Sequence, residues 1–126
     1  MLGAHPIYPV LLSTDLAAAK DFYHDRLGLE ILDENKDALT FSCGAGTQFS
    51  VTKSTVGTAD SQTQVSWLVP DIRVEVADLR SRGVEVEDYD LPGLKTEDGI
   101  ADIGFGWAAW IIDPGKNARG IIQIKD

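Results

Sequence analysis

An apolar run followed by a periodic apolar segment opens the chain. Residues 7–12 form a short apolar run, and from Leu16 to Leu27 apolar residues recur every three or four positions. The run is typical of a strand, and the longer period is typical of a helix with one covered face. Strict alternation over residues 38–43 and 47–52 predicts two further strands with one buried face each.

Helix signals and a short apolar segment complete this first pattern. Asp15 stands where a side chain caps the first helical turn, and Gly28 stands where a left-handed residue closes the last one. Residues 29–32 then predict a short strand. The order is therefore strand, helix and three strands.

The same signals return after 55 or 56 residues. Asp71 follows Asp15 by 56 positions, and the segment 82–86 (RGVEV) matches 27–31 (LGLEI) at an offset of 55. Two signals at nearly one offset indicate an internal repeat. The second copy is predicted to run from a strand at 64–69 through a helix and a short strand at Val84 to Val86, then a long loop, to two closing strands. The turn between these last two strands consists of Asp113, Pro114, Gly115, Lys116 and Asn117, of which Gly115 and Asn117 tolerate a positive φ.

This pattern predicts an α+β fold of two βαβββ modules within a single domain, 1–126. Module one spans about 5–54, a polar linker about 55–63, and module two about 64–126. Each sheet would cover one face with its helix and leave one face open. Two such sheets, curved together, would form a cupped mixed sheet around a cleft with the helices outside.

Neutral hydrogen-bonding side chains dominate the predicted cleft face. Because Leu39 and Phe41 face the helix, the alternate positions face the cleft. These positions are Thr40, Ser42, Gln48, Ser50, Thr52, Gln64 and Ser66. Tyr8 on the first strand and Gly120 on the last belong to the same face. Carboxylate, imidazole and thiolate ligands are missing from this set, so it predicts no metal site and no cofactor.

Trp107 and Trp110 are the aromatic candidates on the strand before the closing turn. A spacing of three sends them to opposite faces of a regular strand, so only one of them can line the cleft. The sequence leaves open which one, and Trp107 is included among the candidates.

Charge and composition exclude several classes of partner. The 126 residues carry 11 basic and 20 acidic side chains, a formal net charge of −9, which repels phosphate backbones and anionic membranes. The apolar run at 7–12 is too short for a signal-peptide core or a membrane span, which predicts a cytoplasmic protein. The acidic segment 85–102 has two interpretations: a solvated loop, or a lid whose charge attracts a cationic ligand.

The chain resembles the vicinal oxygen chelate superfamily, which includes glyoxalases, bleomycin resistance proteins and extradiol dioxygenases. The matching motifs are Thr14-Asp15-Leu16, Phe22-Tyr23, Leu27-Gly28-Leu29, Val69-Pro70-Asp71, Gly83-Val84, Asp113-Pro114 and Gly120-Ile121-Ile122-Gln123. This resemblance covers essentially the whole chain. It implies paired βαβββ modules, and it implies a homodimer.

The superfamily's metal enzymes hold a divalent ion at four positions that fall on Tyr8, Ser50, Gln64 and Gly120. Only Gln64 is of a type usual there, and a neutral amide offsets little of the cost of dehydrating a metal ion. The resulting hypothesis is a metal-free protein that binds a small organic molecule, with a cationic or aromatic ligand among the candidates. Two alternatives remain open: a metal-dependent lyase, isomerase or dioxygenase of the same superfamily, and an interaction module with a vestigial cleft.

Overall fold

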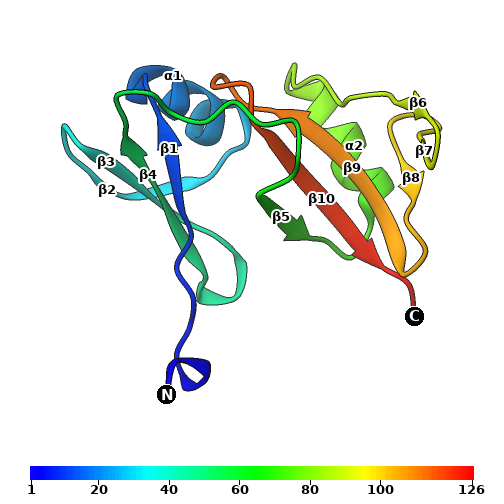
Figure 1. Cartoon of the computed structure of the whole chain (residues 1–126), viewed down its shortest axis with the longest axis horizontal. Coiled ribbons are helices and arrows are strands. Elements are labelled where there is room, and N and C mark those ends of the chain that lie inside the picture. Colours follow the sequence, from blue (N-terminus) through cyan, green and yellow to red (C-terminus); the bar gives the residue numbers. More distant parts are fainter. The chain divides into compact units, whose positions relative to one another are not determined.

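The computed structural model describes all residues, 1–126, and divides into two compact units, Met1–Thr58 and Ala59–Asp126 (Figure 1). The boundary between the units falls inside the segment predicted as a linker. Whether the whole chain is one domain stays a prediction. No helix of the structure combines the length and the apolar composition that a membrane crossing needs.

Unit 1 contains a four-stranded mixed sheet in the order β1-β4-β3-β2. Its strands are β1 (Val10–Ser13), β2 (Glu30–Glu34), β3 (Ala38–Ser42) and β4 (Gln48–Lys53). Three short helical segments complete it: η1 (Leu2–Ala4), η3 (Gly44–Gly46) and, between β1 and β2, α1 (Leu16–Lys20) running into the π-helix η2 (Asp21–Arg26). Strands β1 and β4 are parallel, whereas the other two pairs are antiparallel.

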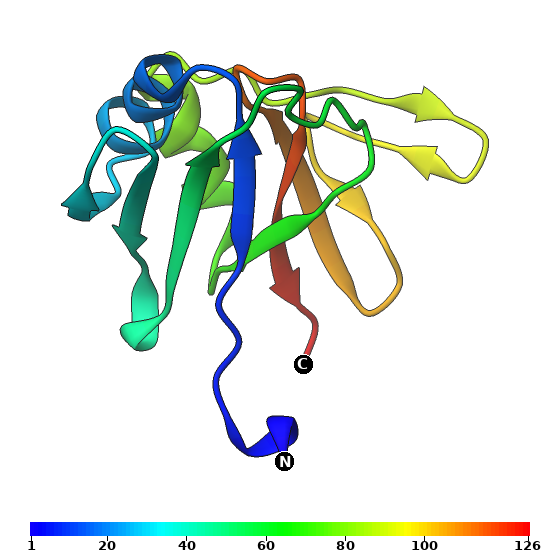
Figure 2. The same cartoon turned by 60° about the vertical axis from the view of Figure 1, so that its left-hand side comes forward.

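Unit 2 repeats this topology with the order β5-β10-β9-β8. Its elements are β5 (Val65–Leu68), α2 (Ile72–Ser81), β8 (Ala101–Asp102), β9 (Gly106–Ile112) and β10 (Ala118–Ile124). A separate two-stranded hairpin, β6 (Asp90–Leu91) and β7 (Leu94–Lys95), extends from the loop after α2 (Figure 2). The first strand is again parallel to the last, so the predicted α+β fold of two modules is confirmed.

The predicted helix signals act as expected. The Asp15 carboxylate accepts a hydrogen bond from the Ala18 amide at 3.1 Å, and the Asp71 carboxylate accepts bonds from the first turn of α2. Gly28 and Gly83 follow the two helices with φ of 76° and 78°. These left-handed residues end each helix where the sequence predicts it.

The prediction of a strand at Val84 to Val86 is wrong. Val84 and Val86 are buried and alternate with exposed Glu85, yet no ladder forms there. Only the amide of Glu87 reaches the sheet, donating to the Trp110 carbonyl at 2.9 Å. Strand β8 occupies the sheet edge instead, since it pairs with Ala108 and Trp107 of β9. Alternation at 84–86 reflects side-chain burial and not strand pairing.

The closing turn also differs in detail from the prediction. The positive φ falls on Lys116, at 70°, and not on Gly115 or Asn117. Asn117 is fully buried, and its side-chain oxygen accepts a hydrogen bond from the Asp60 amide at 3.1 Å. Asn117 therefore anchors the start of unit 2 to the turn, a role that backbone preference alone does not indicate.

Candidate functional site

In each unit the helix covers one face of the sheet, and we call the opposite side the helix-free face. In unit 1 the ring of Tyr23, from η2, lies 5.7 Å from that of Phe41 and 5.6 Å from that of Phe49. Phe41 and Phe49 therefore mark the covered face. Residues that alternate with them, including Thr40 and Ser50, belong to the helix-free face.

The register brings two of the predicted site residues together on this face of unit 1. Ser50 lies opposite Val10 of β1 on one side and opposite Thr40 of β3 on the other. The Tyr8 hydroxyl reaches the Thr40 hydroxyl at 3.5 Å, and Tyr8 is 48% exposed. Tyr8, Thr40 and Ser50 thus form a row of hydroxyl groups, with the phenol as its accessible member.

A β-bulge adds charge that the sequence pattern did not indicate. Strand β2 changes register between Ile31 and Asp33, so Asp33 lies opposite Thr40, and Glu30 lies opposite Ser42. Both carboxylates therefore belong to the helix-free face of unit 1, beside the neutral groups. A bulge leaves no clear signal in a run of polar residues such as this one, because period-two alternation is then lost.

In unit 2 three strands contribute one row to the helix-free face. Gly120 of β10 lies between Ser66 of β5 and Trp110 of β9. A Cβ atom at Gly120 would lie 2.4 Å from the Ser66 hydroxyl oxygen. The Ser66 side chain therefore occupies the space that a side chain at position 120 would need.

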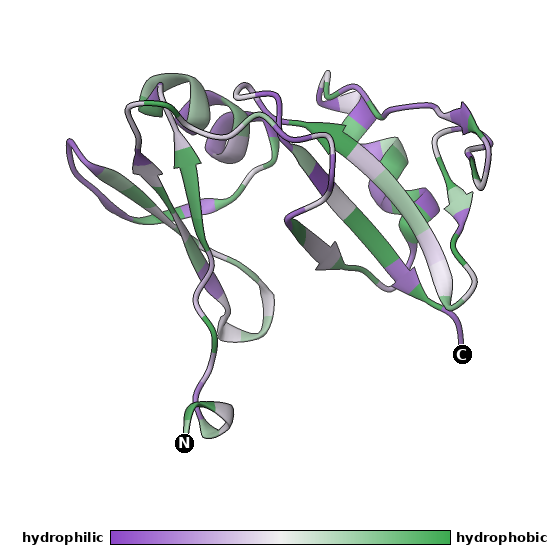
Figure 3. Ribbon diagram, in the orientation of Figure 1, coloured by the Kyte–Doolittle hydropathy of each residue, from purple (hydrophilic) through white to green (hydrophobic).

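Trp110 is held at both ends on this face. Its indole N–H donates to the Thr63 hydroxyl at 3.0 Å, and its ring meets that of Tyr89 edge-on, with centroids 5.6 Å apart. Burial, and secondarily the negative charge of Glu87, raises the pKa of the Tyr89 phenol, so its hydroxyl stays protonated at neutral pH. The next row is apolar, with Leu68 opposite Ile122, and Leu68 is 73% exposed. Apolar segments along β9 and β10 are visible in Figure 3.

Trp107 lies on the other face of β9, which corrects its choice as a candidate. It pairs with Gln123, whose side-chain oxygen accepts the Ile72 amide at the start of α2, so this is the helix side. There the ammonium of Lys125 lies 5.0 Å from the centre of the Trp107 ring and 2.8 Å from the Asp102 carboxylate. The hydrogen bond from Lys125, together with one from the Gly104 amide, lowers the pKa of Asp102.

Gln64 is engaged by a buried cation. The Arg119 side chain is fully buried; one nitrogen donates to the Gln64 amide oxygen at 2.8 Å, and another lies 3.1 Å from the Asp113 carboxylate. The same carboxylate group accepts the Asn117 amide at 2.9 Å. A guanidinium beside the Gln64 oxygen would repel a divalent metal ion at that oxygen. In neither unit do three His, Cys, Asp or Glu side chains gather in a group that could hold a metal.

The acidic loop of unit 2 has a defined internal structure. The Asp88 carboxylate accepts hydrogen bonds from the Thr96 hydroxyl at 3.1 Å and from the Gly99 amide at 2.9 Å. The Thr96 hydroxyl in turn accepts the Tyr89 amide at 2.8 Å. These contacts set the position of Tyr89 against Trp110. The interpretation of the loop as a lid that attracts cations stays a prediction.

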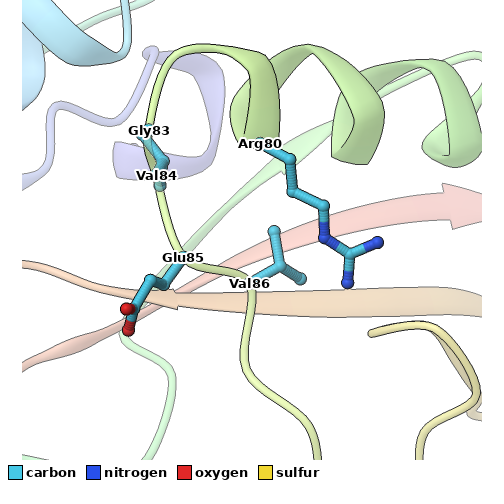
Figure 4. A pocket seen from close by; sticks show the side chains of 5 residues that line it. All are labelled: Arg80, Gly83, Val84, Glu85 and Val86. Atoms are coloured by element: carbon cyan, nitrogen blue, oxygen red, sulfur yellow. The ribbon is translucent and has the colours of Figure 1, made fainter.

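Two hollows lie elsewhere in unit 2. One, of about 370 Å³, is lined by Arg80 and residues 83–86, and in Figure 4 the Glu85 carboxylate points away from the Arg80 guanidinium. Arg80 is bound instead to Asp98, at 2.8 Å. This hollow therefore presents little unpaired chemistry. The other hollow, of about 480 Å³, is lined in part by Trp107.

No protein-family model and no curated protein sequence matches the chain. Solved structures do match it over nearly the whole length. An antibiotic binding protein, TnmS3 from Streptomyces sp. CB03234, is 23% identical, with a TM-score of 0.72 and 96% of each chain covered.

Two further matches carry different names. A bleomycin-binding protein complexed with bleomycin is 17% identical, with a TM-score of 0.69 and coverage of 96% of this chain and 99% of that one. A lactoylglutathione lyase from Agrobacterium tumefaciens is 20% identical, with a TM-score of 0.65 and coverage of 95% and 93%. Because structures at this identity share folds across differing activities, the names do not select one function. The chain has the fold of the glyoxalase and bleomycin resistance proteins, as its sequence motifs predict.

Proposed function

We propose that this protein binds a small organic molecule on the helix-free face of unit 2, without a metal ion. The observation that carries the proposal is the position of Trp110. Its indole is held by Thr63 and Tyr89 and stays partly exposed. An oriented, partly exposed aromatic ring offers a flat surface on which a planar ligand can pack.

The helix-free face of unit 1 is a separate polar surface. Its Tyr8 and Thr40 hydroxyl groups can donate to or accept from a ligand without the cost of removing charge from water, whereas Ser50 is buried beneath them. Glu30 and Asp33 on the edge of that face favour a ligand with a positive charge. The proposed ligand of unit 2 is a compound with a planar aromatic ring system, and the formal net charge of −9 of the chain favours a cationic one.

Two similar structures support this direction by their names, since one is an antibiotic binding protein and one holds bleomycin. Binding of a toxic compound without turnover would make this chain a sequestering protein. The pairing of Gln64 with Arg119 supports the metal-free part of the proposal, because the one amide at a family metal position already bonds to a cation.

Trp110→Ala is the test of this proposal, with Trp107→Ala as the matched control on the opposite face of β9. The probes are bleomycin and berberine, a planar aromatic cation, titrated while tryptophan fluorescence and heat of binding are recorded. We expect saturable binding of at least one probe, and a loss of about tenfold or more in affinity for Trp110→Ala. Trp107→Ala should keep the affinity of the unchanged protein. Equal losses in both variants, or no saturable binding of either probe, would contradict the proposal.

The second candidate, a metal-dependent lyase, isomerase or dioxygenase, is favoured by the likeness to a lactoylglutathione lyase. It is separated from the first by titrating protein prepared without chelator with nickel, zinc, manganese and iron(II). Tight binding of about one equivalent that Tyr8→Phe or Gln64→Ala abolishes would replace the binding-protein proposal.

A further inference from the structure

The hollow that includes Trp107 has the dimensions of a small-molecule site. Its volume is about 480 Å³, within the range of roughly 300–1,000 Å³ that such sites occupy. It lies on the helix side of unit 2, where Ile100 and Trp107 supply its apolar surface. Ile100 is buried and Trp107 is half-buried.

Charged side chains surround this apolar surface, and they fall into two groups. Asp98 is paired with Arg80, and Asp102 with Lys125, both at 2.8 Å. The remaining three charged side chains are Arg73 on α2, Lys95 on β7 and Glu97. These three form no ion pair within 4.0 Å. These three side chains thus offer the pocket both signs of charge, and none of the three is neutralised by an ion pair.

The start of α2 does not compete for an anion at this pocket. The Ile72 amide donates to Gln123, and the Arg73 and Val74 amides donate to Asp71. An anion would therefore meet the Arg73 guanidinium and the Lys95 ammonium. A guanidinium presents a planar set of donors that matches a carboxylate, and the ammonium adds a point charge.

We propose that this pocket binds a small zwitterion, an α-amino acid with an apolar or aromatic side chain. Its carboxylate would bond to Arg73 and Lys95, and its ammonium to Glu97. Its side chain would pack on Ile100 and on the part of Trp107 that the Lys125 ammonium does not cover. Because Trp107 and Trp110 occupy opposite faces of β9, this site is independent of the proposed ligand face.

Three related probes test the charge requirement: L-phenylalanine, 3-phenylpropanoate, which lacks the ammonium, and 2-phenylethylamine, which lacks the carboxylate. Each is titrated to about 10 mM while Trp107 is observed through its indole NMR signal. We expect saturation by L-phenylalanine and affinities about tenfold weaker for the other two, because each loses one charge-assisted contact. Equal affinity of L-phenylalanine and either of the other two probes, or no saturation by L-phenylalanine, would overturn the proposal.

Single substitutions assign the contacts. Arg73→Gln and Lys95→Gln should weaken L-phenylalanine binding by about tenfold, and so should Glu97→Gln. The matched controls, Arg82→Gln and Lys116→Gln, remove a positive charge outside the pocket and should leave affinity unchanged. If the controls lose affinity to the same extent, the weaker binding would result from the change in net charge and not from a lost contact, and the assignment would be overturned. Trp110→Ala should retain L-phenylalanine binding, so this proposal and the proposed function can fail separately.

Discussion

Units 1 and 2 share one topology but differ in what they place on each face of the sheet. The helix-free face of unit 1 carries hydroxyl groups and two carboxylates, whereas that of unit 2 carries the indole of Trp110; each also carries an exposed aliphatic side chain, Val10 in unit 1 and Leu68 in unit 2. A strand order fixes which positions share a face. It leaves the chemistry of that face to individual residues, which is why one fold hosts many functions.

The interiors of the two units differ as well. Unit 1 packs four aromatic rings together: Phe22, Tyr23, Phe41 and Phe49. Unit 2 buries the ion pair of Arg119 and Asp113, with Arg119 opposite Ile111 of β9. One interior depends on shape and apolar area, and the other depends on an exact match of donors to acceptors.

The largest effect is expected from Arg119→Ala. This change leaves the Asp113 carboxylate buried without its cation, which costs about 3–5 kcal/mol in the free energy of unfolding. All three tryptophans lie in unit 2, so denaturation followed by tryptophan fluorescence measures this unit directly. Arg82→Ala, at an exposed pair on α2, is the control and should cost less than about 0.5 kcal/mol. A similar small cost for Arg119→Ala would mean that the pair does not support unit 2.

Phe41→Ala should cost about 3 kcal/mol or more, because it opens a cavity in the aromatic cluster of unit 1. Unit 1 contains no tryptophan, so far-ultraviolet circular dichroism must follow its unfolding. If the chain is one cooperative domain, the tryptophan signal of unit 2 will shift by the same amount. Separate transitions would show that the two units unfold independently.

Gly120→Ala should destabilise the protein by about 1–3 kcal/mol, because the new methyl group overlaps the Ser66 hydroxyl. The double variant Gly120→Ala with Ser66→Gly should recover most of this loss, since it removes the overlapping atom. Thermal unfolding of the two single variants and the double variant measures the coupling. No recovery would mean that Ser66 is not the reason for a glycine at this position.

The helix caps of the two units should differ slightly. Asp71→Ala removes two hydrogen bonds to amides of α2, whereas Asp15→Ala removes one from α1. Each change should cost about 1 kcal/mol in unfolding free energy, with Asp71→Ala the larger. Replacement by Asn, which also caps, is the control for each site. A larger loss for Asp15→Ala would reverse the expected order.

The smallest effect concerns Asp102 and Lys125 in unit 2. Because the folded state lowers the pKa of Asp102, this group stabilises the fold above its unfolded pKa near 4, and the contribution disappears as the pH falls through the lower folded value. Lys125→Met should therefore narrow the difference in melting temperature between neutral and acidic pH. An unchanged pH dependence in Lys125→Met would contradict this assignment.

The sequence predicted the βαβββ repeat because alternation, helix periodicity and Asp and Gly caps all agree within each module. It failed at Val84 to Val86, where alternation is present but the edge of the sheet is formed by β8. It also missed the bulge in β2 that turns Asp33 toward the helix-free face. Both misses concern which residues pair across strands, and the pattern of apolar and polar residues within one strand does not report its partners.

The sequence by itself determined the ends of the helices, the fold class and the order of the elements apart from the strand at Val84 to Val86, since these depend on neighbours a few residues apart. Only the tertiary structure decided that Trp110 shares a face with Gly120, and that Gln64 bonds to Arg119. It also gave Gly120 its packing reason, the Ser66 side chain on the adjacent strand. These outcomes depend on strand register, which hydrogen bonds between distant segments set.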